Sequence, residues 1–573
     1  MQKIKKAPIK MLLLMTSVIP SLNVEPLAAQ IPPIEVKPPS GQPQPELQPL
    51  PPLPEPEQLL PNSPDTITQP ELTPDALAET LIVERFVFVG NTVFSTEQLA
   101  KVATPYTKRR ITFAQLIQLR SELTKLYLDQ GYVTSGVIIP PQTIKAGVVV
   151  IQVVEASIEK INVTGTRRLN ASYVSDRLAM AAGKPFSRIR LLAGLRLLQL
   201  DPLIKSISAD LQPGIRPGIN ILEVKVQEAD SSTYEIILDN ARSPSVGSFR
   251  RRININEGNF SGMGDSVNIG YTNTDGSNGF DISYSLPINP SNAKLNFYYS
   301  NANSNILQEP FNILDITSKS SYYELSFRQP IVQTPTEEFT LGLTASHQTS
   351  QTFLGIDGIG GFPLVVGADE QGNTKVSAVR FFQEWSQRSS QQVIAGRSQF
   401  SFGLGILDAT INSNAPDTRF FSWRGQAQWL RLLAPDTSFL LRADIQLADR
   451  QLLGMEQFGI GGQTTVRGYR QDNLLTDNGI QATAEIRLPI LRVSQIQGVL
   501  QLTPFVDVGT GWNNGGANPK PNTLVTTGIG LLWNQGDRLT GRLDWGIPLT
   551  SNDSKGDTWQ ENGLYFSLTY RPF

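Results

Sequence analysis

The C-terminal region of the chain, residues 231–573, is a succession of runs in which apolar and polar residues alternate. About sixteen such runs are separated by short stretches of Gly, Asn, Asp, Ser and Pro. In the run at 439–448, Arg442, Asp444 and Gln446 take every second position, and the positions between them are apolar. Successive side chains of a strand point to opposite faces, so each run predicts a strand with one apolar and one polar face.

Alternating strands occur in soluble sandwiches and in membrane barrels. Charged residues make up 17% of the sequence, below the roughly 25% of soluble domains. A region of about 340 residues is also large for a sandwich with a single core. A membrane-spanning strand needs about 9–11 residues, so sixteen strands would use about half of the region and leave the rest for turns and loops. The sequence therefore predicts an antiparallel transmembrane β-barrel of about 16 strands over residues 231–573.

The first residues, 1–29, have the three parts of a secretory signal peptide: a basic head, a short apolar core at 11–19, and the small residues Ala28 and Ala29. The mature chain is thus predicted to leave the cytoplasm. No run of about 18 apolar residues follows, so no transmembrane helix is expected. The sequence has no cysteine, which excludes disulfide bonds and thiol chemistry.

Residues 30–79 are dominated by proline, glutamine and acidic residues. Proline removes a backbone donor and fixes φ, so this stretch predicts neither helix nor ladder but an extended, semi-rigid linker. It is either a simple spacer or a docking peptide for a periplasmic partner. We expect residues 31–74 to be mobile, and no helical period precedes Leu81.

Two segments between this linker and the barrel region share one order of elements. Residues 80–156 predict a strand, two helices and two strands, and residues 157–230 repeat that order. In the first copy, Thr112 and Gln115 have the spacing of a capping box, so a helix is predicted to start there and to end at Gly131. The sequence therefore contains two copies of one small β-α-α-β-β module, too few for a solenoid.

The stretch GGQTTVRGYRQ, at 461–471, is polar and rich in glycine, and it lies between two predicted strands. The stretch FVDVG follows at 505–509. Alone, Arg-Gly-Tyr is usually only a turn. Together with two modules and a barrel, however, these stretches resemble the two-partner secretion transporters of the outer-membrane protein-assembly superfamily, whose modules are POTRA domains. The stretches at 131–144 and 259–267 resemble further elements of that family.

The resemblance implies a lumen anchor. The loop between strands eleven and twelve would fold back into the barrel, and its arginine would pair with an aspartate of strand thirteen. Arginine offers a planar fork of donors that matches a carboxylate, and the glycine beside it permits a tight turn. The loop residues are Val466, Arg467, Gly468 and Tyr469, and the strand residues, which share one face, are Phe505, Asp507 and Gly509.

The implied function is a pore in the bacterial outer membrane that captures an unfolded partner exoprotein in the periplasm and exports it. Capture is expected by β-augmentation of the first POTRA module, with apolar contacts in the groove beside the added strand. The partners are then a large β-rich exoprotein and outer-membrane lipid, and we expect no nucleotide, nucleic acid, cofactor or metal. The candidate contact residues are Phe113, Leu116, Ile117, Val137, Ile138 and Ile139.

Three other functions fit the sequence less well. An outer-membrane protein insertase of the same superfamily would usually carry more POTRA modules, and a diffusion porin has no need of periplasmic modules. An enzyme is disfavoured. Asp444 and Glu485 resemble a catalytic pair, but each has an arginine two residues away on its own face, Arg442 and Arg487. That arrangement favours a charge network in the lumen.

Overall fold

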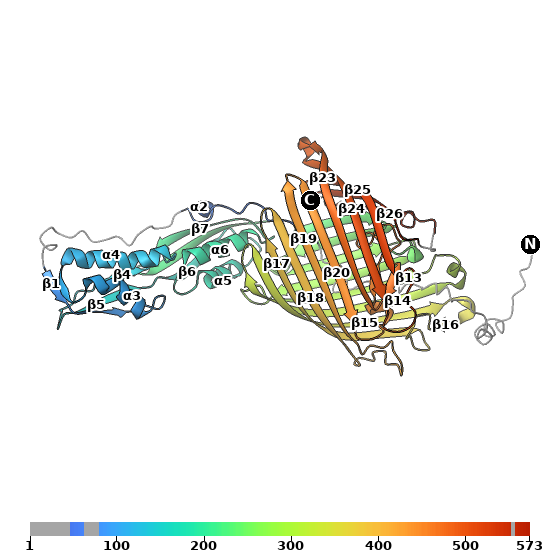
Figure 1. The fold of residues 1–573 in the computed structure, drawn as a ribbon, viewed down its shortest axis with the longest axis horizontal. Coiled ribbons are helices and arrows are strands. Elements are labelled where there is room, and N and C mark those ends of the chain that lie inside the picture. The colour runs from blue at the N-terminus through green and yellow to red at the C-terminus, as the bar shows by residue number, and fades with distance from the viewer. Residues whose placement is uncertain (1–45, 62–79, 552–555, 573) are drawn as a thin grey trace, which may run out of the picture.

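The computed structural model describes residues 46–61, 80–551 and 556–572. The predicted signal peptide, and residues 30–45 and 62–79 of the predicted linker, lie outside these residues. Figure 1 shows an elongated molecule, with two α/β modules in line at one end and a barrel at the other. Within the described ranges, no helix is long and apolar enough to cross a membrane.

Module 1 forms a three-stranded sheet covered by two helices. Strand β5 lies in the centre, parallel to β2 and antiparallel to β4. The predicted capping box of Thr112 and Gln115 is present at the start of α4. The predicted first strand is instead interrupted at Glu84, and its first part pairs with β3 in a separate ribbon. The elements are β1 (Thr80–Val83), β2 (Arg85–Val89), α3 (Thr96–Ala103), β3 (Arg109–Thr112), α4 (Phe113–Asp129), β4 (Gly136–Ile138) and β5 (Val148–Val154).

Module 2 repeats this arrangement, as the sequence predicts. Its sheet has the order β6-β8-β7, so β7 is an edge strand, and two helices cover one face. Their apolar side chains form a separate core. The elements are β6 (Ser157–Thr164), α5 (Ala171–Ala182), α6 (Arg188–Gln199), β7 (Ile204–Pro213) and β8 (Ile219–Glu228).

A carboxylate closes the glycine turn after the first sheet strand in both modules. Glu155 accepts hydrogen bonds from the backbone N–H groups of Thr92 and Val93 at 2.7 and 2.8 Å. Glu228 accepts equivalent bonds in module 2, including one from the N–H of Leu169 at 2.9 Å. Burial alone raises the pKa of both carboxyls, but these hydrogen bonds hold it below the ordinary value. The similar endings of the two closing strands therefore reflect a shared structural device.

Sixteen long strands among the described residues close into one antiparallel barrel, and the two-residue β16 (Gly360–Gly361) adds to the end of β15. The barrel closes where β27 pairs with β9. This confirms the predicted fold class. The long strands are β9 (Ser232–Asp239), β10 (Arg250–Gly258), β11 (Ser266–Asn273), β12 (Ser277–Pro287), β13 (Lys294–Asn305), β14 (Ile316–Gln333), β15 (Glu337–Leu354), β17 (Asn373–Arg388), β18 (Gln392–Leu404), β19 (Phe421–Ala434), β20 (Thr437–Ala448), β23 (Asn478–Val493), β24 (Gly498–Trp512), β25 (Thr523–Gln535), β26 (Leu539–Pro548) and β27 (Leu564–Tyr570).

The two faces of the barrel strands differ as the alternation predicts. On β20, Leu441 and Leu447 are each 40% exposed on the outer face, whereas Asp444 and Gln446 are each 6% exposed on the inner face. The outer surface is thus an apolar band suited to lipid, and the inner surface carries the charged side chains.

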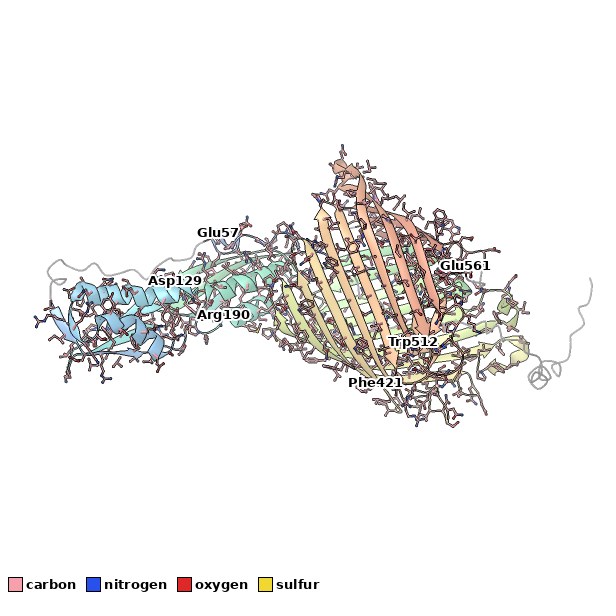
Figure 2. The ribbon with its side chains drawn as sticks, viewed as in Figure 1. Glu57, Asp129, Arg190, Phe421, Trp512 and Glu561 are labelled. Atoms are coloured by element: carbon pink, nitrogen blue, oxygen red, sulfur yellow. The ribbon has the colours of Figure 1, made fainter. Side chains whose placement is uncertain are left out.

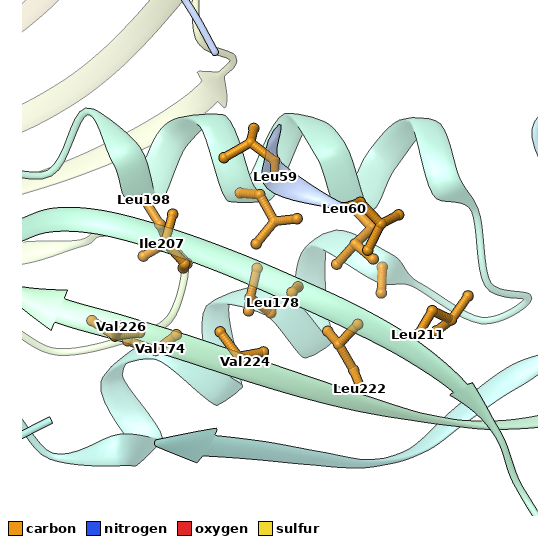
Figure 3. Close-up of a cluster of buried hydrophobic side chains, with 14 of the residues drawn as sticks. Leu59, Leu60, Val174, Leu178, Leu198, Ile207, Leu211, Leu222, Val224 and Val226 are labelled. Atoms are coloured by element: carbon orange, nitrogen blue, oxygen red, sulfur yellow. The ribbon is translucent and has the colours of Figure 1, made fainter. Parts of the chain in front are cut away.

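The N-terminal segment, residues 46–61, corrects one prediction. It is not a free spacer without helix: α2 (Pro56–Leu59) forms one helical turn, and Leu59 and Leu60 are each 1% exposed in the core of module 2, against α6 and β7 (Figure 3). Proline is favourable in the first turn of a helix, where its missing N–H has no partner to lose. One turn is too short to show a helical period, so the sequence pattern could not reveal it.

Candidate functional site

The connection between β20 and β23, residues 449–477, enters the barrel instead of staying outside it. It carries the short strands β21 (Phe458–Ile460) and β22 (Leu474–Thr476), which pair with each other. Its apolar side chains pack together with one wall residue and anchor the loop by burial. This cluster consists of Phe458, Ile460, Val466, Tyr469, Leu474 and Leu524.

Arg467 and Asp507 lie in direct contact inside the barrel. The Nε and Nη2 atoms of Arg467 donate to Oδ2 and Oδ1 of Asp507 at 2.8 and 2.9 Å. The backbone N–H of Arg467 also donates to Oδ2, at 3.1 Å. The two residues are 3% and 0% exposed, so this is a buried bidentate pair. Counted along the barrel, the loop joins strands eleven and twelve, and Asp507 lies on strand thirteen.

The wall of β24 and β26 is shaped to receive the loop. The guanidinium of Arg467 lies 3.3 Å from the centre of the Phe505 ring, a cation–π contact. A Cβ atom at Gly509 would lie 2.9 Å from Cγ2 of Val466. A Cβ atom at Gly546 would lie 2.7 Å from the backbone nitrogen of Gly468. Only glycine lets the loop approach this closely.

The two residues after Arg467 are also held. Gly468 has φ of +93°, a conformation that other residues rarely adopt. Its N–H donates to the hydroxyl of Tyr565 at 3.1 Å, and that hydroxyl donates to the carbonyl of Tyr469. The hydroxyl of Tyr469 donates to the carbonyl of Val525 at 2.9 Å. All four predicted loop residues are therefore buried or bonded within the lumen.

The site contains charged residues that the motifs did not identify. Glu485 of β23 accepts from Nη1 of Arg467 at 2.8 Å and from Arg542 at 2.5 Å. Arg542 also donates to Asp544 at 2.6 Å. The alternation had placed these residues on the polar face of their strands. It gave no cross-strand partners, because those depend on register.

The predicted network around Asp444 and Glu485 is only partly as expected. Glu485 does pair with Arg487, at 2.9 Å. Asp444 instead pairs with Arg424 of the neighbouring strand at 2.6 Å. Arg442, which the sequence placed beside Asp444, binds Glu46 of the N-terminal segment.

The N-terminal segment runs along the inner wall before it reaches module 2. Leu47 packs against a small apolar cluster on β18, β19 and β20, and its carbonyl accepts from Gln428 at 3.0 Å. The N–H of Leu50 donates to the carbonyl of Ser389, in the turn after β17, at 3.0 Å. The segment therefore leaves the barrel at the rim nearest the modules.

The predicted contact residues of module 1 fall into two groups. Leu116 and Val137 are 2% and 4% exposed in the module core, so they support the groove and do not offer a contact surface. This corrects their assignment as binding residues. The other four are half-buried beside the edge strand β4 and on α4, namely Phe113, Ile117, Ile138 and Ile139.

A family model for the haemolysin secretion/activation protein ShlB/FhaC/HecB matches residues 218–532, more than half of the chain. The chain belongs to this family. A POTRA domain of the ShlB type matches residues 81–156. The chain is thus an outer-membrane β-barrel transporter of the two-partner secretion type, with its POTRA region in the periplasm.

Individual relatives are distant but extend over most of the chain. The outer membrane transporter CdiB of Dickeya dadantii (strain 3937) is 20% identical over 420 residues, which are 70% of this chain and 72% of CdiB. The heme/hemopexin transporter protein HuxB of Haemophilus influenzae (strain 86-028NP) is 22% identical over 498 residues, 81% of this chain and 83% of HuxB. Both relatives are named as transporters.

A solved structure shows the same fold. CdiB from Escherichia coli superposes with a TM-score of 0.66 at 19% identity and covers 89% of this chain and 94% of its own. Family membership favours secretion over the insertase and porin alternatives.

Proposed function

We propose that this chain captures its partner exoprotein in the periplasm through the first POTRA module and exports it, unfolded, through the barrel lumen. The observation that carries this proposal is the family match over residues 218–532, which covers the end of module 2 and most of the barrel. Two features of the chain support the finer assignments, one in module 1 and one in the lumen.

The groove of module 1 favours contact through side chains over a long backbone ladder. β4 is an edge strand of only three residues, and Pro140 follows shortly after it. The N–H of Val137 already donates to Oγ1 of Thr124 on α4 at 3.2 Å. An added strand would find few free donors there, so the half-buried Ile117 and Ile138 are the expected source of affinity.

The loop of Arg467 is proposed to hold the lumen in the arrangement that export requires. Its contacts reach strands β23, β24 and β27 at once. A loop fixed to several strands keeps the inner profile of the barrel constant. Loss of this anchor is therefore expected to impair export while the strand ladder, which does not use it, persists.

Substitutions in the groove test the capture step. Ile117→Asp and Ile138→Asp place a charge where an apolar contact is proposed, and each is expected to lower secretion of the cognate exoprotein roughly tenfold, the effect of losing about 1.4 kcal/mol of binding. Ala114→Asp, on an exposed position of α4, is the matched control. Secretion is measured by co-expression with the exoprotein and immunodetection in the medium. Wild-type secretion by both groove variants would contradict capture at this site.

A further inference from the structure

Eight charged side chains form a continuous chain of ion pairs in the lumen, which we call the lumen charge cluster. It links the N-terminal segment to Arg467 through Arg487 and Glu485. Each successive pair lies within 4 Å. The members are Glu46, Arg442, Arg487, Glu485, Arg467, Arg542, Asp507 and Asp544.

The formal charges of this cluster cancel, because it contains four arginines and four carboxylates. Three of the carboxylates belong to barrel strands, and only Glu46 belongs to the N-terminal segment. Without Glu46, four arginines would face three carboxylates. An excess positive charge in a confined lumen is unfavourable, so the wall alone is incomplete.

The excess would appear at one place, where Arg442 of β20 and Arg487 of β23 converge on Glu46. The Nη1 and Nη2 atoms of Arg487 donate to the two carboxylate oxygens of Glu46 at 2.6 and 2.8 Å. Arg442 binds the same carboxylate. Among the described residues, Glu46 is the ion-pair partner of Arg442, and Nε of Arg442 is buried without a hydrogen-bond partner. The pair of guanidinium groups therefore has the chemistry of a carboxylate-binding site.

Glu46 lies on a segment that leaves the lumen at the end of the barrel nearest the POTRA modules. Leu47 and Leu50 hold that segment to the inner wall and the rim. An exported polypeptide would enter from the same side and meet the same wall. The segment that carries Glu46 is held to the barrel wall by side-chain contacts and single hydrogen bonds and is not paired as a strand. The carboxylate of Glu46 can therefore leave its site without breaking the hydrogen bonds between barrel strands.

We propose that Arg442 and Arg487 form an exchangeable carboxylate site on the export path. Glu46 occupies it in the structure described here, and an acidic side chain of the exported polypeptide occupies it during export. This inference rests on the proposed function. Because Arg487 shares Glu485 with Arg467, an empty site would draw Glu485 toward Arg487 and weaken its bond to Arg467, whereas a filled site leaves the anchor of the loop intact.

Current block of the full-length protein in planar lipid bilayers tests the site with a defined probe. Poly-L-glutamate is added on the side that the POTRA modules face, and poly-L-glutamine is the uncharged probe. In the wild type, the tethered Glu46 competes with the probe at a high effective concentration. Glu46→Gln is expected to lower the concentration of poly-L-glutamate needed for half block about tenfold or more. Adding Arg442→Gln is expected to reverse that gain.

Two control variants separate the site from general charge effects. Glu57→Gln removes a carboxylate from the same segment beside module 2, away from the barrel (Figure 2). Arg388→Gln removes an arginine at the rim that contacts only the carbonyl of Gln48 in this segment. Each is made in the wild type, and both are expected to leave the block unchanged.

The outcomes are distinct. The carboxylate site would be overturned if poly-L-glutamate and poly-L-glutamine blocked Glu46→Gln equally. It would also be overturned if adding Arg442→Gln to Glu46→Gln did not reduce the block by poly-L-glutamate. If the double variant fails to insert, the reversal potential of Glu46→Gln is measured in a KCl gradient instead. The carboxylate site predicts a shift toward anion selectivity relative to the wild type, and an unchanged reversal potential would overturn it. Absence of exoprotein secretion by the wild type would instead overturn the proposed function and leave the block result standing.

Discussion

At the scale of residues, the central observation is that one side chain satisfies several partners at once. Arg467 donates to Asp507 and Glu485 and stacks on Phe505. A lysine ammonium is a point charge and cannot reproduce this planar set of contacts. The pair of Arg467 and Asp507 was expected from the family resemblance, because both residues lie in its motifs. Glu485 was not, because the period of two assigns a face and leaves the cross-strand partner open.

Removal of Arg467 is the corresponding prediction. Arg467→Ala leaves Asp507 buried without its partner, and we expect a loss of roughly 3–5 kcal/mol in the free energy of unfolding. Arg467→Lys should recover little of this loss. The measurement is urea unfolding in detergent, read by heat-modifiable gel mobility, with a double-mutant cycle that includes Asp507→Ala.

An exposed pair serves as the control. Arg492 and Asp436 are bonded at 2.8 Å but are 52% and 41% exposed, so Arg492→Ala should cost only about 0–1 kcal/mol. Additive effects of Arg467→Ala and Asp507→Ala, with no coupling free energy, would show that the two groups do not act as a pair.

At the scale of elements, the N-terminal segment joins parts of the molecule that the sequence treats as separate. Its upstream end binds the barrel wall through Glu46, and its downstream end fills the core of module 2 through Leu59 and Leu60. The modules themselves were predictable, because capping boxes and glycine turns are local signals. The position of this segment was not. Glu46 and Arg487 are 441 residues apart in the chain, and proline-rich composition indicates only what the backbone cannot form.

The docking of this segment can be measured. Leu59→Ala removes a side chain that is 1% exposed, and we expect a loss of about 2–5 kcal/mol from its packing against α6 and β7. Gln58→Ala, exposed on the same helical turn, should have no such effect. Limited proteolysis with mass spectrometry should find residues 46–61 protected in the wild type and in Gln58→Ala, and cleaved in Leu59→Ala. Equal cleavage of all three proteins would contradict the docked position.

At the scale of the whole molecule, the alternation of apolar and polar residues predicts the barrel, and the strand topology determines at which end of the barrel each connection lies. β9 starts next to module 2. Counted along the barrel from β9, the connections after the first, third and every further odd strand therefore lie at the far end. The Arg467 loop follows the eleventh strand, β20, and so enters the lumen from that end. The N-terminal segment passes from the lumen to module 2 at the opposite end. The two meet at the lumen charge cluster. The alternation predicted the barrel and the family resemblance predicted the loop, but neither gave a sign that a second segment completes the lumen charge cluster.

The central claim is that the exported polypeptide passes through this lumen. Because the chain has no cysteine, single cysteines report position directly. Ser438→Cys lies on the inner face of β20, where the serine is 5% exposed, and Leu441→Cys lies on the outer face of the same strand, where the leucine is 40% exposed. An exoprotein that carries cysteines and is stalled by a folded C-terminal fusion should form disulfide cross-links with Ser438→Cys and none with Leu441→Cys. Secretion of the unstalled exoprotein by Ser438→Cys without any cross-link to the stalled form, or equal cross-linking at the two positions, would contradict export through the barrel.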